Sequence, residues 1–193
     1  MRMLRDVGLV VAAVAALAVN DGAAQVRGLL GVGLGVPVGN FASGNDGGKA
    51  EAGGGTGLLG VEWLPEGRTL GLRVDGAYSR FCTSACNDAG GNLDQRYRFL
   101  NANLNGLLEV PLGNSAFRPY VTGGFGVYNY RLEGNDVPEG LDSQTDLGAN
   151  AGLGGMYRLG QVSLFAEGRY HHIFSENSDI QYIPVLVGAK LDL

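Results

Sequence analysis

Seven charged residues stand within stretches that are otherwise apolar or rich in glycine and asparagine. They are Glu62, Arg73, Asp75, Glu109, Glu167, Arg169 and Lys190. Paired carboxylates of this kind can serve as a general acid and a general base. Because the set mixes carboxylates with arginine and lysine, we favour an interior cluster in which the charges satisfy one another. A gate whose ion pairs exchange partners is the alternative.

A second group has the residue types of a hydrolase: His171, His172, Ser175 and Glu176. Nucleophilic catalysis requires the base and the hydroxyl to lie within hydrogen-bond reach. On a strand that continues through this segment, His172 and Ser175 point to opposite faces, and adjacent histidines cannot share a metal ion. We therefore expect interfacial side chains here, and no enzyme, metal site or cofactor.

Two cysteines, Cys82 and Cys86, lie four residues apart in a segment that we expect to be a loop from about residue 81 to 95. In an oxidising compartment a local disulfide is favoured over two free thiols. A zinc site would need further Cys or His ligands, which this loop lacks.

The first 24 residues have the pattern of a cleavable signal peptide. Arg2 and Arg5 precede an apolar segment from Val7 to Val19, and Gly22 and Ala24 stand where a signal peptidase reads small residues. The apolar segment is shorter than the roughly 20 residues that a membrane-spanning helix needs. We expect cleavage before Gln25 and a single mature domain over 25–193, with an uncleaved anchor as the alternative.

The elements that must position the charges are strands. From Tyr182 to the last residue the chain alternates strictly, with apolar residues on one face: Ile183, Val185, Val187, Ala189, Leu191 and Leu193. A period of two predicts a strand. Similar alternation recurs seven times before it, over about 26–37, 59–63, 70–79, 98–110, 117–128, 146–157 and 162–171. The charged residues fall on the polar face of these strands.

The connections between these strands alternate between long and short. The long ones cover about 38–55, 81–95, 131–144 and 175–180, and the short ones lie near 65–67, 113–115 and 160–161. Aromatic residues flank both kinds, with Trp63, Phe117 and Tyr157 beside the short turns and Tyr78, Tyr170 and Phe174 beside the long loops. An even strand count, this loop pattern and two aromatic girdles are typical of transmembrane barrels. The sequence therefore predicts an all-β, eight-stranded antiparallel up-and-down transmembrane β-barrel, with four long loops outside the cell.

The polar face must then line a narrow lumen, and the 34 glycines explain how it is filled. An eight-stranded barrel is just wide enough for its own side chains. Glycines beside Tyr120, Tyr128, Met156 and Phe165 make room for those side chains. A soluble lipocalin-like barrel, with its apolar face turned inward, is the alternative fold.

Over its mature length the chain resembles the small eight-stranded bacterial outer-membrane barrels, a family that includes the OmpA-like transmembrane domain. Gly188, Leu191 and Leu193 match the family's C-terminal assembly signal, except that the family usually ends on an aromatic residue and this chain ends on leucine. The resemblance implies residence in the bacterial outer membrane. The implied partners are outer-membrane lipid, lipopolysaccharide and the barrel-assembly machinery, and the extracellular partner is unknown.

Two function classes remain. The first is a structural or surface-interaction scaffold that displays extracellular loops, and the second is a narrow, porin-like pore for ions or small solutes. The net charge of -5 and the pI near 5.0 argue against nucleic acid, which is bound by clustered lysine and arginine.

Overall fold

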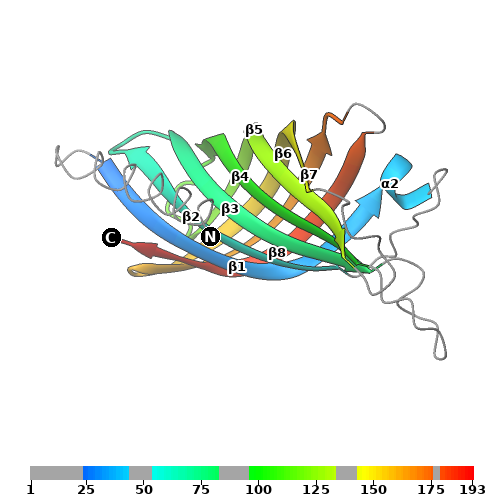
Figure 1. Cartoon of the computed structure of the whole chain (residues 1–193). Coiled ribbons are helices and arrows are strands. Elements are labelled where there is room, and N and C mark those ends of the chain that lie inside the picture. The colour runs from blue at the N-terminus through cyan, green and yellow to red at the C-terminus, as the bar shows by residue number, and fades with distance from the viewer. Residues whose placement is uncertain (1–23, 44–53, 83–95, 134–142, 176–178) are drawn as a thin grey trace.

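The computed structural model describes residues 24–43, 54–82, 96–133, 143–175 and 179–193. Eight strands in this part of the chain form one closed antiparallel barrel in sequence order (Figure 1). Their bounds are β1 (Ala24–Val38), β2 (Gly54–Pro65), β3 (Leu70–Cys82), β4 (Arg96–Glu109), β5 (Phe117–Glu133), β6 (Gln144–Leu159), β7 (Val162–Ile173) and β8 (Ile180–Asp192). This confirms the predicted fold and its strand count.

Closure depends on the pairing of the first and last strands. β1 pairs with β8 from Arg27↔Asp192 to Val38↔Gln181, while its other edge pairs with β2. Each strand therefore has a partner on both sides, as a barrel in lipid requires of its backbone groups. The backbone amide of Leu193 also donates to the Val26 carbonyl at 2.9 Å, so the last residue is held beside β1.

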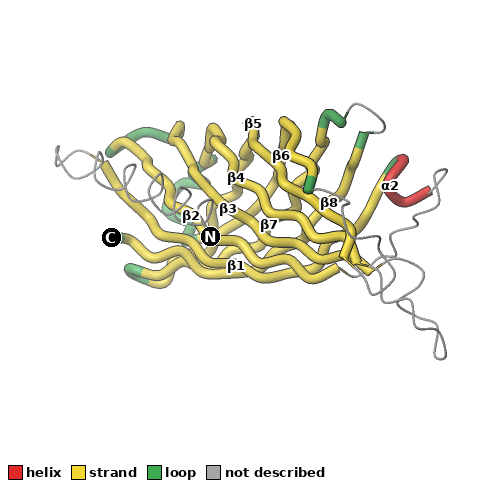
Figure 2. The backbone as a smooth tube through the Cα atoms, in the orientation of Figure 1, coloured by secondary structure: helices red, strands yellow, loops and turns green. Residues whose placement is uncertain are grey.

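The short turns lie at the same end of the barrel as the C-terminus (Figure 2). Gly67, Gly113 and Gly160 adopt positive φ angles of 68°, 57° and 75° in these turns. A residue with a side chain would be strained in that conformation. A four-residue helix, α2 (Asn40–Ser43), lies at the opposite end (Figure 1). No helix in the described part of the chain is long and apolar enough to cross a membrane.

Side chains alternate between an exposed apolar wall and a buried interior. Leu104, Phe125 and Leu153 on the wall are 59%, 72% and 70% exposed, whereas charged side chains on the inner face of the barrel, such as Glu62 and Arg73, are buried. A soluble protein would hide the first set and expose the second. The orientation therefore favours lipid outside the barrel and excludes the lipocalin-like arrangement.

Glycine makes room for the large inward side chains. A Cβ added to Gly154 would lie 2.4 Å from Cζ of Tyr120, and one added to Gly148 would lie 2.7 Å from Cε2 of Tyr128. Gly188 has the same relation to Phe165 at 2.7 Å. These ring positions agree with the predicted filling of the lumen.

At the end with the long connections, the strands are longer than predicted. β3 continues through Cys82 and β5 through Glu133, and the expected loop over 38–55 contains α2. The reason is an aromatic cluster inside the barrel mouth, described below, which gives these strand ends an interior to pack against.

Candidate functional site in the barrel lumen

The strands place eight charged side chains in the interior, and seven of them are the predicted set. Four are cations and four are carboxylates, all at most 2% exposed: Arg27, Arg73, Arg169, Lys190, Glu62, Asp75, Glu109 and Glu167. Strand register brings several together, because Arg27, Glu62 and Arg73 lie abreast on β1, β2 and β3. Opposite charges on neighbouring strands of one face attract each other.

Arg73 lies between two carboxylates. Its Nε and Nη2 donate to Oε1 of Glu62 at 2.9 and 2.6 Å, and its Nη1 donates to Oε2 of Glu167 at 2.6 Å. Lys190 Nζ donates to the same Glu62 oxygen at 2.8 Å and lies 4.2 Å from the centre of the Tyr120 ring. The Tyr120 hydroxyl in turn donates to Glu167 at 2.9 Å.

Arg169 joins this group to a third carboxylate, Asp75. Its Nη1 donates to both oxygens of Asp75 at 3.0 and 2.9 Å, while Nε and Nη2 donate to Oε1 of Glu167 at 2.9 and 2.6 Å. Asn103 and Asn105 also donate to Asp75, at 3.0 and 2.8 Å. Two of the three asparagines on the inner face of β4 therefore complete the hydrogen bonding of a buried anion.

Arg27 is the interior charge that the sequence analysis missed. Its Nη2 is hydrogen bonded to Glu109, and its Nε lies 3.5 Å from Oε2 of Glu62. Alternation along β1 could have predicted an inward side chain here, because Arg27 is an even number of residues from the inward glycines, among them Gly31. With Arg27 included, every interior carboxylate faces at least one cation, so no member of the set is a free acid or base.

An aromatic cluster closes the lumen at the end opposite the short turns. Phe81 and Phe99 are 0% exposed and contact one another with ring centres 5.6 Å apart. Phe41, carried by α2, packs edge-on against both at 5.5 and 5.7 Å. Tyr182 lies beneath them, 5.4 Å from Phe81. We call these four residues the aromatic cap.

Sequence comparison assigns the family. A model described as "Outer membrane protein beta-barrel domain" matches residues 9–191. The chain belongs to this family. Its place is the bacterial outer membrane. No curated protein matches the chain.

Several solved outer-membrane barrels share the fold. Neisserial surface protein A, NspA, is 16% identical with a TM-score of 0.58, covering 90% of this chain and 100% of that one. Ail, the attachment invasion locus protein of Yersinia pestis, crystallised with the heparin analogue sucrose octasulfate, is 13% identical with a TM-score of 0.55, covering 90% and 99%. The outer-membrane enzyme PagL is 16% identical with a TM-score of 0.50, covering 86% and 99%. At these identities the likeness shows the fold alone.

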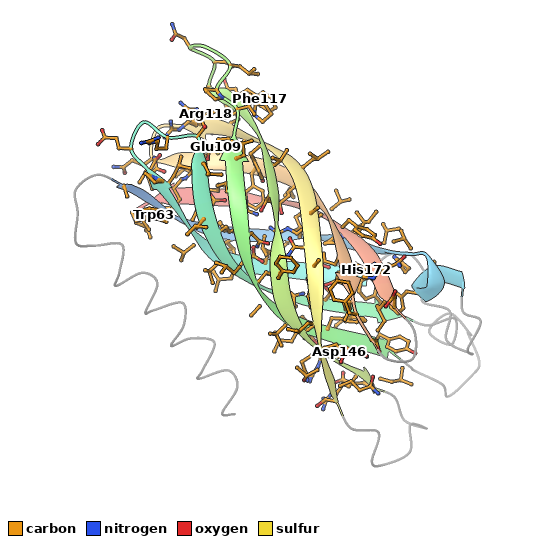
Figure 3. The ribbon with its side chains drawn as sticks, turned by 90° about the horizontal axis from the view of Figure 1, so that it is seen from above. Trp63, Glu109, Phe117, Arg118, Asp146 and His172 are labelled. Atoms are coloured by element: carbon orange, nitrogen blue, oxygen red, sulfur yellow. The ribbon has the colours of Figure 1, made fainter. Side chains whose placement is uncertain are left out.

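Membrane residence gives the two ends of the barrel distinct surroundings. Trp63 and Phe117 lie near the short turns, and His172 and Asp146 lie toward the other end (Figure 3). Phe117 pairs directly with Tyr157 across β5 and β6. In outer-membrane barrels the short turns are periplasmic, and aromatic girdles mark both interfaces. By this general rule we expect the end with the aromatic cap to be the extracellular mouth.

The histidines of β7 do not form a hydrolase site with the serine. His171 is buried in the lumen, stacked on Tyr182 at 4.8 Å, with its Nδ1 2.8 Å from the Tyr128 hydroxyl. His172 is on the other face, 3.2 Å from Asp179. The Ser175 hydroxyl lies 3.0 Å from that of Tyr130, and Glu176 is outside the described residues. Within the described residues no three His, Cys, Asp or Glu side chains are grouped as a metal site.

The remaining predicted residues lie at the strand ends. Cys82 is the last residue of β3, and Cys86 is outside the described residues, so the disulfide stays a prediction. The signal peptide also lies outside them. Gly188 faces the lumen against β1, while Leu191 and Leu193 are 48% and 75% exposed on the wall. Their role in assembly stays a prediction.

Proposed function

We propose that the protein is a surface-interaction scaffold, with a packed lumen that supports extracellular loops and conducts little. The observation that carries this proposal is the filled interior. Four cations and four carboxylates are buried and mutually paired, and the aromatic cap lies across the extracellular mouth. An open pore would need charges that remain hydrated, and these are not.

The distribution of the connecting segments supports a display role. The strands that these connections join end at the proposed extracellular end of the barrel. The connections between β1 and β2, β3 and β4, and β5 and β6 have 15, 13 and 10 residues, against 4, 7 and 2 in the three turns at the other end, while the connection between β7 and β8 has 6. Binding residues in proteins concentrate on loops held by a rigid scaffold. Ail, which shares the fold, is named the attachment invasion locus protein.

The alternative is a narrow pore, and single-channel conductance in planar bilayers separates the two. We expect little steady conductance from the refolded wild type. Glu167→Ala or Arg169→Ala should raise it, because each makes the numbers of interior cations and carboxylates unequal and removes side-chain volume from the lumen. Arg158→Ala is the control, since Arg158 is 30% exposed near the periplasmic mouth and its partner, Asp192, is not one of the interior carboxylates.

A large and stable wild-type conductance that neither interior substitution alters would reject the scaffold and favour the pore. In that case the interior ion pairs would not block the path that the ions take through the lumen. A rise with Arg158→Ala equal to that with Arg169→Ala would also count against the proposal, since the interior pairs would then not be what closes the lumen.

A further inference from the structure

Three arginines lie side by side on the outer wall of the barrel at its extracellular end. Arg80 on β3 is the register partner of Arg98 on β4, which is the partner of Arg131 on β5. Their side chains point away from the lumen, because the residues beside them on each strand, Phe81, Phe99 and Tyr130, are buried inside. We call the three residues the arginine row.

Within the described residues, the carboxylates near the arginine row are fewer than its three cations. Like charges directly opposite one another on a sheet are destabilising. One carboxylate, Glu133, serves all three: it is bonded to Arg131, lies 3.2 Å from Arg98 and lies 3.9 Å from Arg80. Three cations facing one anion leave a net positive charge, in contrast to the balanced lumen.

Glu133 remains an anion despite its position. Partial burial by itself raises the pKa of Glu133, but the hydrogen bond from Arg131 and the charges of Arg98 and Arg80 outweigh that effect and lower the pKa. This residue is at the extracellular end of β5, beyond the outer aromatic girdle. The positive excess of the row is therefore that of three guanidinium groups and one ionised carboxylate.

The height of the row on the wall indicates what lies beside it. Arg80 is two residues beyond Tyr78, a 41% exposed girdle residue on the same face of β3. Two strand residues correspond to about 7 Å. The guanidinium groups therefore stand just above the hydrocarbon, at the level of the lipid headgroups, and the wall below them is apolar through Leu100 and Leu104.

We propose that the arginine row binds the phosphate groups of lipopolysaccharide in the outer leaflet. Guanidinium groups present paired donors that match phosphate oxygens, and charge-assisted hydrogen bonds of this kind are about twice as strong as neutral ones. With side-chain exposures of 43%, 30% and 43%, Arg80, Arg98 and Arg131 can be reached from the membrane. The proposal rests on outer-membrane residence and is independent of whether the lumen conducts.

A soluble sulfated polysaccharide is the other polyanion to consider, but the geometry favours the lipid. The row faces sideways from the barrel wall and not upward from its mouth. A headgroup anchored by acyl chains against the apolar wall is held at this height, whereas a soluble polymer would have to enter the headgroup layer.

The test uses the full mature barrel, refolded in detergent and titrated with purified lipopolysaccharide, with binding followed by native mass spectrometry. The triple variant Arg80→Gln, Arg98→Gln and Arg131→Gln should weaken binding by at least about tenfold. The matched control, Arg118→Gln with Arg158→Gln, removes two partly exposed arginines at the periplasmic end and should leave binding unchanged. Enzymatically dephosphorylated lipopolysaccharide should bind the wild type as weakly as the intact lipid binds the triple variant.

A second variant guards against misfolding of the triple variant. Glu133→Gln removes the carboxylate that competes with phosphate and should tighten binding of the intact lipid several-fold. Heat-modifiable mobility on SDS gels checks that each variant is folded. Equal affinity of the wild type for intact and dephosphorylated lipid would overturn the proposal. So would preferential binding of sucrose octasulfate or inorganic phosphate over the lipid, because the row would then be a site for a soluble anion.

Discussion

Replacing Arg73 by methionine should be among the most damaging single changes in the barrel. Arg73 is 0% exposed and donates three hydrogen bonds, two to Glu62 and one to Glu167. Methionine keeps most of the aliphatic volume, so the change isolates the loss of charge and donors. The interior would then hold three cations against four carboxylates.

Removing one partner of a buried ion pair costs about 3 to 5 kcal/mol of unfolding free energy, because a charge is left without compensation. Here the loss should fall near the lower end. Glu62 keeps its hydrogen bond from Lys190, and Glu167 keeps those from Arg169 and Tyr120. Adding Glu167→Gln to Arg73→Met restores equal numbers of cations and carboxylates. The double variant should therefore be more stable than the sum of the two single losses implies, by at least about 1.5 kcal/mol.

The assay is urea unfolding of the barrel in lipid vesicles, followed by tryptophan fluorescence. Trp63 is the single tryptophan and lies on the outer face of β2, so its emission reports transfer between lipid and water. Arg158→Met is the matched control. Arg158 is 30% exposed and lies 3.8 Å from Asp192, a surface pair worth about 0 to 1 kcal/mol. Equal losses for Arg73→Met and Arg158→Met, or strict additivity in the double variant, would refute the reasoning.

Three further predictions test the wall, the packing and the assembly signal. Leu104→Arg, on the lipid face, should lower the unfolding free energy by about 2 to 4 kcal/mol in the same vesicle assay. Leu159→Arg, beside a periplasmic turn, should lower it by about 0 to 1 kcal/mol, and equal losses would contradict a lipid boundary. Gly154→Ala should cost about 1 to 3 kcal/mol because the added methyl meets a tyrosine ring, while Gly168→Ala, with no atom within 4 Å of its new Cβ, should be close to neutral in that assay. Deletion of Leu191–Leu193 should leave the protein in the periplasm on cell fractionation, and normal insertion would remove these residues from the assembly signal.

The strand count and the inner and outer faces could be predicted because they depend on a local signal. A period of two assigns each residue to a face without any knowledge of neighbours. Once Arg73, Arg169 and Lys190 are assigned inward, the cost of burying charge predicts that each lies near a carboxylate. The structure has these pairs. Which carboxylate each cation meets depends on the register between strands, and alternation alone does not predict that register.

Contacts across the barrel could not be predicted in the same way. Gly152 is an example, because a Cβ there would lie 3.1 Å from Cγ of Arg169 and Cγ2 of Thr122. Such crowding depends on side chains from three strands. The aromatic cap was missed for a related reason, since Phe41 and Phe81 lie in segments whose glycine and polar content is typical of loops. Their common contact appears only after closure.

The two charged regions of this barrel differ in how their charge is compensated, and that difference bears on function. In the lumen each cation has a carboxylate, so the interior needs no external ion and gains nothing from admitting one. On the outer wall, in the part of the chain that the structure describes, the arginine row has one carboxylate for three guanidinium groups. Uncompensated charge is retained where a partner supplies the counter-charge or where water screens it. The arginine row faces the lipid headgroups, so it can bind anionic groups there. The lumen charges are already paired, so separating them would only lower the stability of the barrel.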